Sequence, residues 1–148
     1  MHQCQRRANH IIVFENLDYA IVQLVHNFGA AAVVGVAIFA LYPAAQPVPV
    51  QRKFAWLVGL GWAAQALSGM GFSAVSYYFY EKLPDLHGVA FAALLIKIMC
   101  AVGGLSIAVM YLRQGAGWTE EKRRAAWKLL IALGVTALTA AAFLRWFA

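Results

Sequence analysis

The sequence predicts an all-α integral membrane protein: a four-helix bundle with antiparallel up-down topology and both termini on the same side. Hydrophobic residues make up 63% of the 148 positions and charged residues only 12%, whereas soluble domains carry about 25% charged residues. A water-soluble fold of this length cannot bury so much apolar surface, because small domains have a large surface relative to their volume. Lipid is therefore the expected solvent.

Four long apolar segments follow one another and form a single transmembrane domain, residues 1-148. Each is close to the roughly 20 residues that a helix needs to cross the bilayer core, and the expected spans lie at approximately 19-42, 54-80, 89-112 and 126-146. The first two spans contain no charged residue, and the third contains one, Lys97. The fourth reaches full length because Lys128 and Arg145 can extend their charged groups to the two interfaces.

Lysine and arginine residues outside the apolar segments predict the orientation. One side of the membrane holds seven of them, in two loops: Arg52, Lys53, Arg113, Lys122, Arg123, Arg124 and Lys128. The other side holds four: Arg6, Arg7, Lys82 and Arg145. Because cytoplasmic loops carry the excess of basic residues, we expect a protein of the bacterial inner membrane with both termini in the periplasm. Arg6 and Arg7 in the N-terminal tail favour the opposite orientation.

The partners expected from composition are lipids. A net charge of +6 suggests nucleic acid in a soluble protein, but these basic residues flank apolar segments and form no nucleic-acid motif. No nucleic acid is expected; other membrane subunits or a homo-oligomer are possible partners. Small residues let helix backbones approach closely in lipid, and the spans contain Gly29, Gly35, Gly59, Gly61, Gly69, Gly71, Gly103 and Gly104. They predict compact packing, with clearance for a cofactor as the alternative.

Polar residues in the first two spans are the first candidates for a site. Gln23, His26 and Asn27 lie on one face of the first helix by their spacing. Polar groups in a membrane turn toward partners or cavities, and Gln65 and Ser68 of the second span are candidate partners. His26 is then either a ligand or proton carrier, or a structural polar contact.

Lys97 is the one charge deep within a span, which makes it the candidate catalytic residue. Helix rise places His26 roughly 10 Å and Lys97 roughly 14 Å below the outer border, so the two are expected to face each other. No carboxylate lies within the spans. Lys97 is therefore expected to be neutral, or to meet an anionic group on a ligand, such as a propionate or a lipid phosphate.

The sequence contains residues for two alternative metal sites. His87 precedes the third span on the same side as His26, but helix rise places it roughly 10 Å higher. The two can share a metal only if the preceding turn dips inward, and they could more easily contact different parts of one large flat cofactor. Soft sulfur atoms suit Cu(I), which makes copper an alternative for Met70, Met99, Cys100 and Met110. Methionine is also an ordinary gap-filler.

The segments LVHNFGAAAVVG in the first span and LLIKIMCAVGG in the third, in a chain of four short spans, resemble a group of small bacterial membrane proteins. The group includes the HemJ-type protoporphyrinogen oxidases and the membrane domain of copper-resistance protein D. The resemblance implies haem b inside the bundle, with His26 as an axial ligand and Lys97 meeting a propionate or assisting proton transfer. It implies a haem-dependent oxidoreductase for electron transfer or for porphyrin or copper handling.

A second hypothesis is a non-catalytic subunit or assembly factor of a larger membrane complex. It fits the small size and the many small residues of the spans. A small transporter fits less well, because the spans contain neither acidic coupling residues nor a pair of broken helices. A coloured, haem-containing protein would favour the first hypothesis, and a colourless protein that copurifies with partners would favour the second.

Overall fold

The computed structural model describes residues 2–42, 46–81 and 87–147, and every regular element among them is helical. The elements are α1 (His2–Ala31), the π-helix η1 (Ala32–Val36), α2 (Ala37–Leu41), α3 (Val48–Tyr80), α4 (Gly88–Gln114), the short 3₁₀ helix η2 (Gly115–Gly117) and α5 (Glu120–Phe147). The all-α prediction is confirmed. The predicted turn at Lys82, Pro84 and Asp85 lies outside the described residues.

Three stretches of helix in the described part of the chain are long and apolar enough to cross a membrane: Asn16–Leu41, Gly88–Gly117 and Glu120–Phe147. The protein therefore has the make-up of a helical membrane protein. The second expected span lies in α3, which has ample length at 33 residues. It is not among those three stretches, because glycines and polar residues such as Gln65 and Ser68 dilute its aliphatic side chains.

Local sequence explains where the helices begin and end. Proline suits the first turn of a helix, and α3 follows Pro47 and has Pro49 in its first turn. It ends at Glu81, whose φ of 53° is left-handed. At the start of α4 the backbone also needs a positive φ, and a glycine, Gly88, occupies that position. The hydroxyl of Thr119 accepts a hydrogen bond from the Lys122 amide and caps the start of α5.

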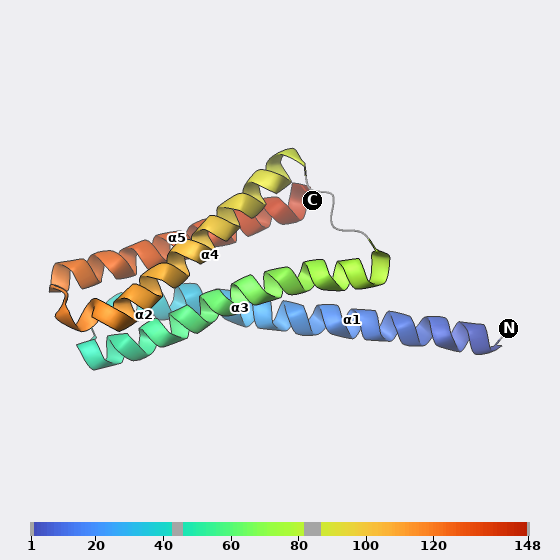
Figure 1. The fold of residues 1–148 in the computed structure, drawn as a ribbon, viewed down its shortest axis with the longest axis horizontal. Helices are drawn as coiled ribbons and strands as arrows, with labels where there is room; N and C mark the ends of the chain where they lie inside the picture. The colour runs from blue at the N-terminus through green and yellow to red at the C-terminus, as the bar shows by residue number, and fades with distance from the viewer. Residues whose placement is uncertain (1, 43–45, 82–86, 148) are drawn as a thin grey trace.

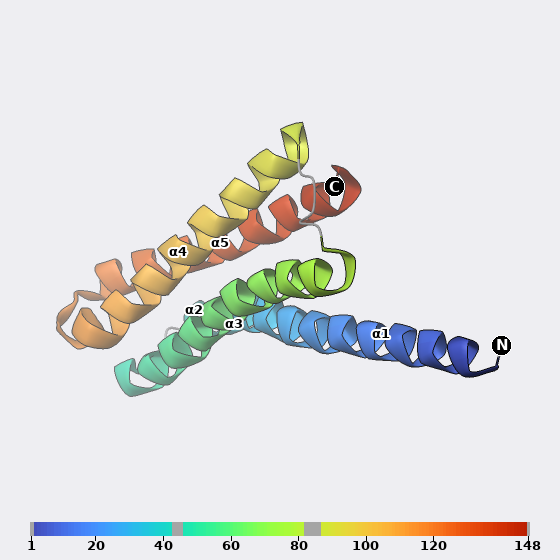
Figure 2. The same cartoon turned by 45° about the vertical axis from the view of Figure 1, so that its right-hand side comes forward.

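The helices form two pairs that meet at one end and diverge at the other (Figures 1 and 2). The first pair joins α3 to the rod of α1, η1 and α2, and the second joins α4 to α5. The pairs touch where α3 meets α4 and where η1 and α2 meet α5. Both chain ends lie toward the open end of this V-shaped arrangement (Figure 1).

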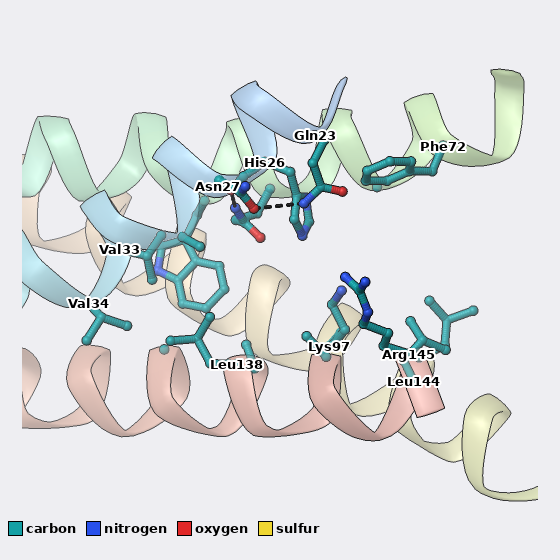
Figure 3. Close-up of a pocket in the computed structure, with 18 of the residues that line it drawn as sticks. Gln23, His26, Asn27, Val33, Val34, Phe72, Lys97, Leu138, Leu144 and Arg145 are labelled. Atoms are coloured by element: carbon teal, nitrogen blue, oxygen red, sulfur yellow. Dashed lines mark hydrogen bonds between the residues drawn. The ribbon is translucent and has the colours of Figure 1, made fainter. Parts of the chain in front are cut away.

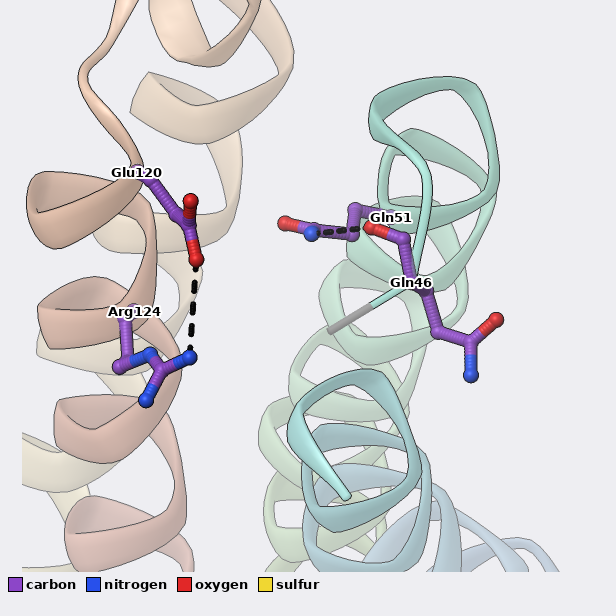
Figure 4. A network of polar contacts seen from close by, with 4 residues as sticks. All are labelled: Gln46, Gln51, Glu120 and Arg124. Atoms are coloured by element: carbon purple, nitrogen blue, oxygen red, sulfur yellow. Dashed lines mark hydrogen bonds and ion pairs between the residues drawn. The ribbon is translucent and has the colours of Figure 1, made fainter. Parts of the chain in front are cut away.

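A buried polar cluster ties three helices together at the closed end. Gln51 of α3 is only 6% exposed, and its Oε1 accepts hydrogen bonds from Trp127 Nε1 at 3.0 Å and from the Tyr111 hydroxyl. Its Nε2 donates to the Gln46 carbonyl at 2.5 Å (Figure 4). The amide of Gln51 thus has partners on both sides, as a buried polar group requires.

The contact between α3 and α4 depends on a glycine. Trp62 is 2% exposed, and its indole ring lies directly against the backbone of Gly104. The Trp62 Nε1 has no hydrogen-bond partner in the part of the chain that the structure describes, so packing alone holds this contact. Gly29 and Gly61 make a similar close approach between α1 and α3, where a Cβ added at Gly61 would lie 3.2 Å from the Gly29 carbonyl oxygen.

Gly104→Ala is expected to lower the free energy of unfolding by about 2 kcal/mol, because a larger residue in a well-packed core forces its neighbours to move. The added Cβ would overlap the ring of Trp62, which has little room to shift. Gly103→Ala is the matched control, since a Cβ there meets Leu133 Cδ1 at an ordinary 3.5 Å. Denaturant titrations in neutral detergent measure both variants, and equal stabilities would contradict this account of the packing.

Candidate functional site

A cavity of about 480 Å³ lies between the two helix pairs, toward the end where they diverge (Figure 3). This volume falls within the roughly 300–1,000 Å³ typical of ligand and cofactor sites. Polar side chains gather at one end of the cavity: Gln23, His26, Asn27, Gln65, Lys97 and Arg145. Apolar side chains, including Val33, Val34, Trp62 and Leu138, line the rest.

The imidazole of His26 is anchored to α3 through Ser68. Its Nδ1 lies 2.7 Å from Ser68 Oγ, and Ser68 Oγ also lies 2.5 Å from the carbonyl oxygen of Ala64. A hydroxyl has one hydrogen, and Ser68 directs it to the backbone, 2.5 Å from the Ala64 carbonyl oxygen and 3.3 Å from that of Gln65. We therefore assign the proton of the neutral imidazole to Nδ1, as the donor to Ser68. In the neutral ring Nε2 is then the unprotonated nitrogen.

Two further contacts fix the position of this ring. Gln65 Nε2 donates to the backbone carbonyl of His26, which ties α1 to α3 at the level of the imidazole. Phe72 meets the imidazole edge-on, with ring centroids 5.7 Å apart and an interplanar angle of 72°. The imidazole projects into the cavity (Figure 3), so Nε2 is the nitrogen left for a ligand.

Gln23 and Asn27 form a polar pair next to His26. Gln23 Nε2 donates to Asn27 Oδ1 at 2.8 Å, across one turn of α1 (Figure 3). Both residues line the cavity, so the three polar residues of the first span share one face of α1, as their spacing requires. This hydrogen bond leaves one amide hydrogen of Gln23 and the NH₂ group of Asn27 available to a ligand.

Lys97 and Arg145 reach the cavity from the wall opposite His26. Lys97 comes from the middle of α4 and Arg145 from the last turn of α5, and both side chains point into the cavity (Figure 3). Within the described residues neither side chain makes a hydrogen bond or an ion pair, and no acidic residue lines the cavity. The site therefore combines one imidazole with two cations that lack an anionic partner.

Arg145 was missed as a site residue by the sequence analysis, which used it as an anchor at the membrane border. Basic residues are expected at such borders, so its sequence position carries no signal that separates an anchor from a ligand-binding residue. Only the approach of α5 to α4 in the fold brings it to the cavity that Lys97 also lines.

Other predicted site residues lie elsewhere. Ser68 is buried behind His26 and touches the cavity only through it. His87 precedes α4 and does not line the cavity, so this site contains one of the two histidines proposed to share a metal. The four sulfur side chains proposed for copper do not line it either: Met70, Met99 and Met110 are exposed and Cys100 is buried in the core. Among the described residues, no three histidine, cysteine or acidic side chains form a metal-binding group.

The π-helix η1 forms the inner end of the cavity, which the sequence did not predict. Val33 and Val34 of this segment line the cavity opposite Gly134 of α5. A Cβ at Gly134 would lie 2.8 Å from Val34 Cγ2, so glycine allows η1 and α5 to approach and close this end. Single π-turns within α-helices are frequent at functional sites.

Ser68→Ala is expected to remove the partner that holds His26 in the Nδ1–H form and to lower the free energy of unfolding by about 1 kcal/mol. Nitrogen NMR of histidine-labelled protein in detergent distinguishes the two ring nitrogens and measures which one carries the proton. Ser73→Ala is the matched control, because Ser73 lines the same cavity but makes no hydrogen bond among the described residues. An unchanged His26 spectrum in Ser68→Ala would contradict this assignment of the proton.

Comparisons with protein-family models, curated proteins and solved structures give no match for this chain. The resemblance to HemJ-type oxidases and copper-resistance protein D stays a prediction based on the segments around His26 and Lys97. The case for function therefore depends on the cavity and the groups that line it.

Proposed function

We propose that this chain is a four-span membrane protein that binds haem b in the cavity, with His26 Nε2 as an axial ligand, and acts in electron transfer or porphyrin handling. The observation that carries the proposal is the contact of His26 Nδ1 with Ser68 Oγ at 2.7 Å. It leaves an unprotonated nitrogen directed into a cavity of cofactor size.

The residues around the cavity fit such a group. A metal-ligating histidine usually donates its other N–H to a second residue that fixes the ring, and Ser68 does this for His26. Haem carries carboxylates at one edge and apolar groups at the other, and the cavity has cations at one end and valines and Trp62 at the other. Copper is favoured less, because the sulfur side chains do not meet at the cavity.

Bound haem would supply one-electron chemistry. In this chain His26 would ligate, Ser68 would hold the imidazole in position, and the apolar lining would exclude water. Lys97 would meet a carboxylate or hold a proton at Nζ beside the site. These roles are the ones a protein contributes to a haem centre: ligation, burial and control of the surrounding charge.

We infer four spans, with α3 as the fourth. It contains no charged residue from Phe54 to Tyr80, and it packs between α1 and α4, where its polar side chains are shielded from lipid. With α3 included, the chain forms an antiparallel four-helix bundle with both termini on one side. The excess of basic residues in the first and third loops favours a cytoplasmic location for those loops. The termini would then lie in the periplasm of a bacterium, with the bundle in the inner membrane.

Purified protein supplied with haem is expected to show a Soret band, and His26→Ala is expected to reduce haem occupancy at least about tenfold, because it removes the axial ligand. Absorbance and haem-to-protein ratio measure this in neutral detergent. His87→Ala is the control and should retain the band, since His87 lies off the cavity. A band of equal strength in His26→Ala would contradict the proposal. A colourless wild type that copurifies with other membrane proteins would favour the non-catalytic subunit or assembly factor instead.

Alkaline phosphatase fused after Phe147 is expected to be active in a bacterial host, because this enzyme folds only in the oxidising periplasm. Fusion after Gly117, in the turn between α4 and α5, should be inactive. Green fluorescent protein at the same two positions is the control and should give the reverse pattern. Activity only at the Gly117 junction would contradict the proposed orientation, and activity at both would contradict a spanning α5.

A further inference from the structure

Two basic side chains line the wall of the cavity that faces His26. Lys97 belongs to α4 and Arg145 to α5, and both point toward the same region (Figure 3). Neither has a hydrogen-bond or ion-pair partner in the described ranges 2–42, 46–81 and 87–147. Cations of equal sign repel each other, and the repulsion grows as water is excluded. An arrangement of this kind is stable in a membrane only when an anion or water compensates it.

The two cations offer different contacts to one anion. The guanidinium of arginine presents a planar set of donors that matches a carboxylate or phosphate, and the ammonium of lysine adds a compact charge. Because Lys97 is half-buried, it is the cation that a membrane penalises more. An anionic group between them would satisfy both.

The rest of the cavity indicates what the anionic group would be attached to. Away from the cations, the walls consist of apolar side chains such as Val33, Trp62 and Leu138. Gly69 also lines it, and a Cβ at this position would meet nothing within 4 Å, so the cavity is open there. A polar end and an apolar end in one cavity match a molecule with the same division.

We propose that the cavity is a binding site for an anionic amphiphile, whose carboxylate or phosphate lies between Lys97 and Arg145 while its apolar part lies along Val33, Trp62 and Leu138. The inference uses the same cavity as the proposed function, and the carboxylates of haem would satisfy it. It does not require iron or ligation by His26, so metal-free amphiphiles test it separately.

The test uses three probes that share one twelve-carbon chain: dodecanoate, dodecyl phosphate and dodecanol. Equilibrium binding of each is measured on the full chain reconstituted in phosphatidylcholine nanodiscs, which carry no net charge. We expect wild-type protein to bind at least one anionic probe about tenfold more tightly than dodecanol, since charge-assisted hydrogen bonds are stronger than neutral ones. The preferred anionic probe then identifies the group as carboxylate or phosphate.

Substitutions test whether the preference for anionic probes depends on Lys97 and Arg145. Lys97→Gln and Arg145→Gln are each expected to weaken binding of the preferred anionic probe about tenfold and to leave dodecanol binding unchanged. Lys128→Gln is the matched control: Lys128 is a basic residue on the same helix as Arg145, toward its other end, and does not line the cavity. It should bind like wild type. Equal binding of all three probes, or Gln variants that bind like Lys128→Gln, would overturn the proposal.

A salt titration of the wild type gives a second measurement that does not depend on any variant folding. Added salt should weaken the binding of the anionic probes and leave dodecanol binding unchanged. Binding of the anionic probes that does not depend on salt concentration would overturn the proposal. The outcomes also separate the anion site from the proposed haem binding. A protein without a Soret band that still prefers anionic probes would contradict haem binding alone. A Soret band without that preference would overturn the anion site alone.

Discussion

The contact between α1 and α3 is the constraint on which the site depends. A polar group surrounded by lipid must find a partner within the protein, and the close approach of Gly29 to Gly61 brings the two helices near enough to provide one. Gln65 and Ser68, on the next turns of α3, then reach the backbone and the ring of His26. With its Nδ1 engaged, the imidazole has one orientation and one nitrogen to offer.

The polar groups at the two ends of the molecule differ in how well they are paired. At the closed end, the amide of Gln51 forms hydrogen bonds with Trp127, Tyr111 and the Gln46 carbonyl. This cluster holds the ends of three helices together. At the open end, Lys97 and Arg145 have no matching anion among the described residues. Lys97 is half-buried and Arg145 is exposed, so the open end leaves both groups accessible to a molecule that enters the cavity.

Much of this arrangement was predictable from the sequence, because the membrane restricts what a chain can do. Long apolar segments require helices, and the positions of His26 and Lys97 along their spans place them at similar depth. Ser68 was a candidate partner by its position in the second span, but the backbone hydrogen bonds of its hydroxyl, from which the proton of His26 is assigned, needed coordinates. The helices extend beyond the predicted spans, since helix continues past the apolar core into the polar flanks.

Other features could not be predicted. Arg145 looks like a border residue until α5 is placed beside α4, and the packing of helix pairs depends on side-chain fit, which no single segment encodes. The lower apolarity of α3 likewise has its explanation in tertiary structure, since this helix lies between two others. For His87, residue type and position on the same side as His26 suggested a ligand, and the structure places it at the start of α4, off the cavity.

The π-turn at Ala32–Val36 sets the rotational phase between two halves of one rod. Residues before it pack on α3, and residues after it pack on α5. In an α-helix each residue turns the chain by about 100° about the helix axis. A π-turn contains more residues per turn, so it changes the direction in which side chains after it point relative to those before it. Once His26 and its neighbours are fixed against α3, these five residues set which face of α2 meets α5. The number of residues in this segment, rather than any polar group in it, thus positions the wall that closes the inner end of the cavity.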